Sequence, residues 1–243
     1  DDIVNELIIP AMRVSKEVLI KSAYFSNQGL AQLAPGLSEI IQNNDSTLKL
    51  LISIKGISDK ETLSTIQNSA DITQERIEEL FKGLLTACEE DRLHKHAKDC
   101  LTYLLATEKA ELRLVGMVND NAIWHKKAYI FKENINHLTI TGSANCTQFG
   151  FTANGEELIA ELNPIEQWHE GKFLSTWNGN HDYCKTFKPS PLLLEELKSI
   201  APELPPQSIE IDHLIKSRIL ESAKIGTINT SIEDNNQNDH IAE

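Results

Sequence analysis

The chain has 243 residues, 40% of them hydrophobic and 24% charged, which is enough for one large folded domain with an appendage and excludes a wholly disordered protein. Its formal net charge is -13 at pH 7. So acidic a chain does not coat nucleic acid or an anionic membrane through bulk electrostatics, because like charges repel over about a Debye length. Chemistry on phosphates would therefore need a local basic site.

The four cysteines, Cys88, Cys100, Cys146 and Cys184, are widely spaced and follow no paired pattern. This spacing favours a reduced, cytoplasmic protein over a disulfide framework. No apolar run approaches the roughly 20 residues that cross a bilayer, and the N-terminus lacks the basic start of a signal peptide, so we expect no membrane partner. Because the sequence does not begin with Met, we expect it to be a piece of a longer protein.

Apolar periodicity predicts an α/β sheet, beginning with a helix within residues 3–20 that leads into a strand at 18–24. A second helix, expected at 29–42, precedes a nearly continuous apolar run at 48–54. Such a run is typical of a strand buried on both faces. From 59 to 106, apolar residues recur at steps of three and four, which indicates helices that cover the sheet.

Four short strand-like runs follow, at 111–115, 128–131, 138–141 and 157–162. The residues Glu133–Asn136 between the second and third runs predict a hairpin turn. The strands and helices together favour a mixed sheet flanked by helices.

From residue 186 onward, prolines punctuate the sequence, with helical patches at 192–200 and 209–220. The last residues, 231–243, contain acidic residues and no Lys or Arg, a composition expected to stay disordered. We therefore expect a catalytic domain at 1–185, followed by a helical linker and acidic tail at 186–243.

The most informative stretch has the order His-x-Lys, strand, hairpin, strand, Gly-Ser-x-Asn, loop, Glu. Residues two apart in a strand point the same way, so His125 and Lys127 can face one phosphate together. A phosphodiester can be cleaved without metal if an imidazole attacks phosphorus, a cation and amide donors hold the oxygens, and a carboxylate orients the imidazole. His125 is the candidate nucleophile, Lys127 and Asn145 with Ser143 the oxyanion clamp, and Glu156 the carboxylate.

These residues resemble the signature of the phospholipase D superfamily, in particular its single-motif nuclease branch. The resemblance covers residues 18–162, because the lead-in strands ending in Ser22–Ser26 and Ile52–Lys55 are also family-like. It implies a phospholipase D-like fold, a covalent phosphohistidine intermediate, and no cofactor or metal. It also implies a homodimer, because the family's site needs two His-x-Lys motifs. The family often has Asp where this chain has Lys132, which counts further against the lipase branch.

A second His-x-Lys, at His96–Lys98, is not followed by Gly-Ser-x-Asn. It lies in a charged amphipathic stretch, so we interpret His94, His96 and Lys98 as a solvated helix face. The same stretch contains Cys88 and Cys100, but the spacing is not one of the strong zinc patterns, and we predict no metal site.

Secondary substrate contacts are predicted at the ends of the family-like strands and beside the motif, at Tyr24, Ser26, Lys55, Trp124 and Lys126. Trp124 could stack on a base, although a tryptophan beside a strand is more often a core residue. Trp168 and Trp177 are interpreted as packing residues. Glu157 competes with Glu156 for the carboxylate role, and the family position favours Glu156.

The sequence thus predicts a metal-independent phosphodiesterase of nucleic acid, with DNA favoured, acting as a homodimer in a bacterial defence system. The motif region is locally basic, since residues 113–132 contain four cations and Asp120 alone as an acid. A lipid phosphodiesterase is one alternative, but no amphipathic basic helix is visible. A non-catalytic dimerisation or DNA-docking module is another, and the linker after the domain favours a helicase or other motor as the C-terminal partner.

Overall fold

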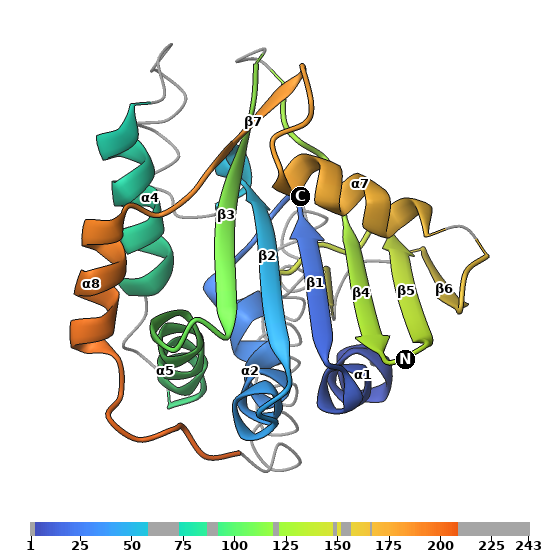
Figure 1. Ribbon diagram of the computed structural model, residues 1–243, viewed down its shortest axis with the longest axis horizontal. Coiled ribbons are helices and arrows are strands. Elements are labelled where there is room, and N and C mark those ends of the chain that lie inside the picture. Colours follow the sequence, from blue (N-terminus) through green and yellow to red (C-terminus); the bar gives the residue numbers. More distant parts are fainter. Residues whose placement is uncertain are drawn as a thin grey trace, which may run out of the picture. The chain divides into compact units, whose positions relative to one another are not determined.

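The computed structural model describes only part of the chain (Figure 1). The described residues are 3–57, 73–86, 92–118, 122–147, 150–151, 157–165 and 167–208. They all belong to one compact unit that runs to Ser208, and a second unit comprises Ile209–Glu243. The helical patch expected at 209–220 and the tail expected at 231–243 lie outside the described residues.

The described residues form a seven-stranded mixed sheet with the order β6-β5-β4-β1-β2-β3-β7. β1, β2 and β3 run parallel, whereas every other pairing is antiparallel. The strands are β1 Glu17–Ser22, β2 Thr47–Ser53, β3 Ala110–Met117, β4 Ala128–Glu133, β5 Asn136–Gly142, β6 Leu158–Leu162 and β7 Cys184–Phe187. Six of the seven agree with the predicted runs, and the predicted α/β class with a mixed sheet between helices is confirmed.

β7 is the strand that sequence analysis did not predict. It has four residues and pairs antiparallel with the far end of β3, where Met117 lies opposite Cys184. So short a strand carries almost no alternation of its own, and its pairing with β3 is what defines it.

Helices lie on both faces of the sheet. α2, Asn27–Gln42, packs against α1, Ile9–Val14, and against α5, Arg92–Ala106, while α8 packs on α5. α7 crosses in front of β1 and β4 in Figure 1, with α2 behind the sheet. The remaining helices are α4 Gln74–Thr86, α7 Trp168–Trp177 and α8 Pro191–Ile200, and a π-helical turn, Val4–Ile8, precedes α1.

The α7 face of the sheet is built from alternate strand residues. Leu19, Leu51 and Ile130 are buried there beneath Phe173 and Trp177. Phe173 and Trp177 are four residues apart, which places both rings on one side of α7, where they stack with 5.6 Å between centroids. α7 was not predicted as a helix, because these two apolar positions make a short pattern among polar neighbours.

The predicted hairpin is confirmed by the pairing of Glu133 with Asn136. This register leaves a two-residue turn between β4 and β5, and its first residue, Asn134, has φ 52°. Two-residue hairpin turns need a left-handed conformation at the first central position, which asparagine tolerates better than most residues.

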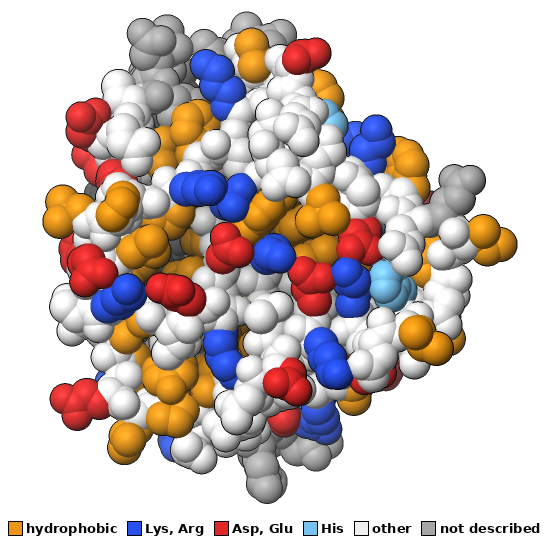
Figure 2. Space-filling view, in the orientation of Figure 1, with side chains coloured by type: hydrophobic (Ala, Val, Ile, Leu, Met, Phe, Trp, Pro, Cys, Tyr) orange, Lys and Arg blue, Asp and Glu red, His pale blue; other side chains and the backbone are white. Residues whose placement is uncertain are grey.

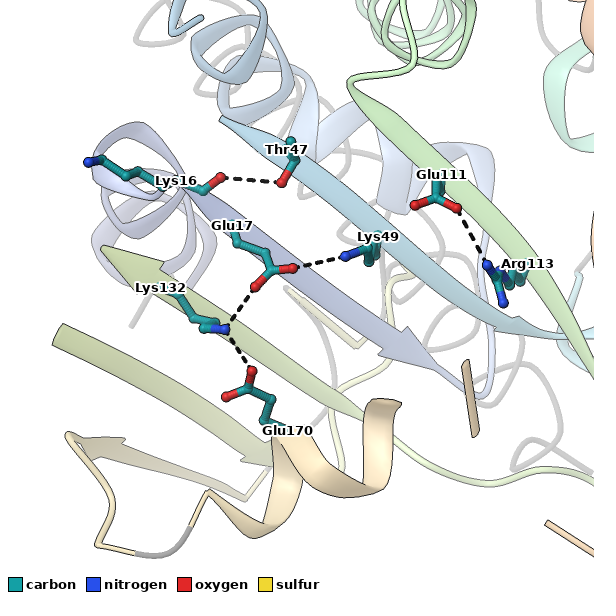
Figure 3. Close-up of polar contacts among 8 residues, drawn as sticks. All are labelled: Lys16, Glu17, Thr47, Lys49, Glu111, Arg113, Lys132 and Glu170. Atoms are coloured by element: carbon teal, nitrogen blue, oxygen red, sulfur yellow. Dashed lines mark hydrogen bonds and ion pairs between the residues drawn. The ribbon is translucent and has the colours of Figure 1, made fainter. Parts of the chain in front are cut away.

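An ion-pair network crosses the α7 face (Figure 3). Lys132 Nζ lies 2.8 Å from Glu17 and 2.6 Å from Glu170 of α7, and Lys49 lies 3.0 Å from Glu17. Burial opposes both charges, but hydrogen bonds from Lys132 and Lys49 lower the pKa of Glu17. Hydrogen bonds to Glu17 and Glu170 likewise raise the pKa of Lys132. The network therefore ties α7 to β4 and β1.

Candidate active site

Four of the predicted catalytic residues, His125, Lys127, Ser143 and Asn145, gather at one edge of the sheet, where β1 and β2 end, β4 begins and β5 ends. The register sets this arrangement, because Lys21 pairs with Ala128 and Ala128 pairs with Thr141. Each strand's next few residues therefore reach the same edge, the position at which open sheets place ligands.

His125 and Lys127 lie together just before β4. Lys127 Nζ is 2.7 Å from His125 Nε2 and 3.0 Å from Nδ1. The imidazole is exposed and meets the Tyr24 ring edge-on, with 6.0 Å between ring centroids. Burial and the nearby Lys127 ammonium lower the pKa of His125. A neutral imidazole is thus favoured at neutral pH, which is the form that can act as a nucleophile.

The Gly-Ser-x-Asn segment lies alongside the end of β1. Asn145 Oδ1 accepts a hydrogen bond from the Tyr24 backbone N–H at 3.0 Å, and the Cys146 N–H donates to Ser22 Oγ at 2.8 Å. The Ser26 N–H then donates to the Cys146 carbonyl at 3.1 Å. These bonds bring Asn145 beside Tyr24, whose ring contacts His125, although the two segments are more than 100 residues apart.

Ser143 is held by the start of β6. Its N–H donates to the Glu157 carbonyl at 3.1 Å, and its Oγ accepts from the Glu157 N–H at 3.1 Å. The preceding Gly142 has φ 147°, and a Cβ there would lie 2.0 Å from the Glu157 carbonyl oxygen. Glycine is therefore required at this position. Glu156, the predicted carboxylate, lies outside the described residues, and the choice between Glu156 and Glu157 stays a prediction.

The predicted substrate contacts occupy different environments. Tyr24 is 38% exposed at the edge, Lys126 is exposed, and Lys55 is half-buried in a 3-10 turn after β2. The Ser26 hydroxyl caps α2 by accepting from the Gly29 N–H at 3.1 Å. Trp124 is 3% exposed in the cluster beneath α7, which favours the core role that was weighed against base stacking.

The basic residues of segment 113–132 are not all at the site. Arg113 lies over the Trp177 ring, 4.0 Å from its centroid, and donates to the Trp177 carbonyl, while Lys132 belongs to the ion-pair network. Only Lys126 and Lys127 of the four cations are near His125. On the face drawn in Figure 2, basic and acidic side chains are interspersed, and no broad basic surface is visible.

The second His-x-Lys, the decoy motif at His96–Lys98, lies on α5. His96 and Lys98 are both partly buried there, and the Cys100 sulfur lies 3.4 Å from His96 Nε2. Within the described ranges, no group of three or more His, Cys, Asp or Glu side chains is arranged to hold a metal ion. Cys88, which was considered as a zinc ligand together with His94, His96 and Cys100, falls outside those ranges.

Two tryptophans that were interpreted alike differ in the structure. Trp177 is buried between α7 and the sheet, as interpreted. Trp168, in contrast, is 56% exposed, and its ring meets that of His169 edge-on with 4.8 Å between centroids. Trp168 begins α7 and lies beyond the sheet cluster, so the interpretation of Trp168 as a packing residue is wrong. None of the described helices combines the length and apolar character needed to span a bilayer.

Residues 88–187 match the family model described as the NgoFVII restriction endonuclease N-terminal PLD domain. This range holds both the His-x-Lys and the Gly-Ser-x-Asn segments. The match supports a phospholipase D superfamily domain of the nuclease-like kind in this part of the chain. The chain is also similar to a solved phospholipase D family member, Nuc from Salmonella typhimurium, with 15% identity and a TM-score of 0.41, over 76% of this chain and 90% of that chain. No curated protein matches this chain.

Proposed function

We propose that this domain is a metal-independent phosphodiesterase that cleaves nucleic acid through a covalent phosphohistidine, at a site shared by two copies of the chain. The observation that carries the proposal is the pairing of His125 with Lys127 at 2.7 Å on an exposed sheet edge beside Asn145 and Tyr24. The match of residues 88–187 to a restriction endonuclease domain supports nucleic acid as the substrate.

In the proposed first step, a ring nitrogen of His125 attacks phosphorus and forms a P–N bond as a P–O bond breaks. His125 of the second copy begins as the imidazolium, donates its proton to the departing alkoxide and becomes neutral. Lys127 and the Asn145 amide group stabilise the negative charge on the non-bridging oxygens. Water, deprotonated by the second histidine, then cleaves the P–N bond and restores the free imidazole. Glu156 would orient the imidazole.

The second copy is needed because each chain supplies one usable His125. His96 lies on α5, which packs on α2 and α8, and not on the strands that carry His125 and Asn145, so we assign the acid to the second copy. We further propose that the domain works in a bacterial defence protein, with a helicase or other motor as its C-terminal partner. The restriction endonuclease family that the chain matches supports the defence role.

A cleavage assay tests the chemistry. Supercoiled plasmid and labelled oligonucleotides are incubated with purified protein in EDTA. We expect cleavage by the wild type and none by His125→Ala, while His96→Ala, the matched control in the decoy motif, still cleaves. Binding without cleavage by the wild type would favour the docking module, and hydrolysis of phosphatidylcholine vesicles alone would favour the lipid phosphodiesterase.

The shared site is tested separately, by dilution and mixing. Activity per chain should fall as the protein is diluted below the dimer dissociation constant measured by sedimentation. Mixing wild-type chains with an excess of His125→Ala chains should reduce the activity per wild-type chain, because mixed dimers hold one histidine. Full activity in a species that sediments as a monomer would overturn the shared site.

A further inference from the structure

Lys21 is a buried cation close to the candidate active site. It lies near the end of β1, pairs with Ala128 of β4 and is 5% exposed. In the sequence it is one polar residue in an apolar strand, a pattern that gives no sign of a site. A lysine is almost never buried to this degree unless a partner compensates the charge.

Strand alternation places Lys21 on the α7 side of the sheet, two residues after Leu19, which is buried beneath α7. Lys126 precedes Ala128 by two residues in the segment that enters β4, and Ala128 belongs to the same cluster beneath α7. Lys126 therefore extends on the same side as Lys21. Trp124, two residues before Lys126, is buried in the same cluster, so the alternation of β4 extends back through this segment and places His125 and Lys127 on the opposite side.

The charge that acts on Lys21 is that of another lysine, while Glu161 acts on His169 rather than on Lys21. Lys126, in the segment before β4, repels it, and His169 of α7 lies close enough for Lys21 to lower the pKa of that imidazole. Burial, with the Lys126 charge, lowers the pKa of Lys21 to about 8. Among the residues that the structure describes, no carboxylate forms an ion pair with Lys21.

Two other lysines on the same face differ in this respect. Lys49 and Lys132 are each less buried than Lys21, and each is paired with Glu17 at 3.0 Å or less. Lys21 is thus more deeply buried than Lys49 and Lys132, and the charge that acts on it is that of Lys126 at the site edge. An anion placed between Lys21 and Lys126 would remove this repulsion and supply the missing counter-charge.

We propose that Lys21 and Lys126 form a second phosphate subsite, which binds the phosphate next to the scissile one in a nucleic acid strand. The inference rests on the proposed function, because it takes His125 and Lys127 as the scissile site. Lys126 is the residue between them in sequence, so the two subsites lie on opposite sides of one short segment. A chain of phosphodiesters can occupy both, whereas a phospholipid with one phosphodiester occupies one.

Binding rather than cleavage tests the subsite. The affinity of the His125→Ala protein for a fluorescent single-stranded oligonucleotide is measured in EDTA as a function of salt. Each phosphate contact contributes about 0.7 to the slope of log affinity against log salt on a single strand. We expect Lys21→Met in this background to reduce the slope by about 0.7 and the affinity by roughly tenfold.

Lys49→Met is the matched control, because it removes a cation from the same face at a position paired with Glu17 and remote from the edge. It should leave the slope unchanged. Lys126→Met, at an exposed position, should repeat the loss seen with Lys21→Met. An unchanged slope and affinity in both Lys21→Met and Lys126→Met would overturn the subsite.

The outcome for the subsite is separate from the outcome for the nuclease. Loss of slope in both variants with no cleavage by the wild type would support the subsite and contradict the proposed catalysis. Cleavage by the wild type, with unchanged salt slopes in both variants, would support the proposed catalysis and contradict the subsite. If Lys21→Met and Lys126→Met lost binding to phosphatidylcholine vesicles as strongly as binding to the oligonucleotide, the assignment of the subsite to nucleic acid would be overturned.

Discussion

The side-chain oxygen of Asn145 accepts a hydrogen bond from the backbone N–H of Tyr24, with 3.0 Å between the two atoms. The bond assigns the amide oxygen to the protein and leaves the amide NH2 group as a donor toward the edge where His125 lies. Asn145 thus fixes the loop after β5 to the end of β1, and in the proposed mechanism its amide NH2 group would also donate to a phosphate oxygen.

Asn145→Asp separates these two roles. The aspartate keeps an oxygen acceptor for the Tyr24 N–H but loses both donors and brings a negative charge to the phosphate. We expect the cleavage rate on an oligonucleotide to fall by about 10²–10³-fold, the range for loss of one oxyanion donor. The melting temperature should stay close to that of the wild type. Asn145→Ala, which also loses the acceptor, should lower both, and an active Asn145→Asp enzyme would contradict the role in charge stabilisation.

Lys132 stands where the family often has Asp, and its partners explain the exchange. Glu17 and Glu170 both lie within 2.8 Å of the lysine nitrogen. Removing the cation in Lys132→Met leaves two partly buried carboxylates together, and we expect a loss of about 1–2 kcal/mol in the free energy of unfolding. Lys132→Asp should cost more, because it places a third carboxylate in the cluster. Urea denaturation at pH 7 measures both.

The pH dependence of this stability follows from the pKa shifts. The lowered pKa of Glu17 contributes stability above its unfolded value, and this stability is lost as the pH falls through the folded value. The raised pKa of Lys132 contributes below its unfolded value and is lost as the pH rises through the folded value. The destabilisation by Lys132→Met should therefore be greatest near neutral pH and shrink toward acid and alkali; a pH-independent difference would refute the ion-pair origin.

His125 should titrate below the ordinary histidine value because burial and Lys127 disfavour its cation. Proton NMR of the imidazole reports this pKa directly. Lys127→Met removes the neighbouring charge, so the pKa of His125 should rise toward that of a free histidine. Lys55→Met, which removes a cation after β2, serves as the control and should leave the titration unchanged. An unshifted His125 pKa in Lys127→Met would show that the two side chains do not interact in solution.

Gly142 permits the turn that positions Ser143. At φ 147° a Cβ would lie 2.0 Å from the Glu157 carbonyl, which is backbone and cannot move aside cheaply. Gly142→Ala should destabilise the domain by about 1–3 kcal/mol and lower the cleavage rate, because the paired Ser143–Glu157 bonds must shift. Gly171→Ala, on α7 in open space, is the control and should be neutral or stabilising. Equal stabilities of the two variants would contradict the strain.

The sequence by itself determined the sheet class, six strands, α2 and the hairpin at Asn134. Each of these has a local cause, either an apolar period of two or 3.6 residues or the turn preference of asparagine. It also pointed to His125, Lys127, Ser143 and Asn145, because their order along the chain is a family signature that does not depend on knowing the fold.

Only the tertiary structure decided which charged and aromatic residues act together. The partners of Lys132 are Glu17 and Glu170, far away along the chain, so the basic character of segment 113–132 could not be judged from that segment. The burial of Lys21 likewise depends on α7 covering β1, and β7 exists only through its pairing with β3. Periodicity is a property of neighbours in sequence, whereas solvation and electrostatic partners are properties of neighbours in space.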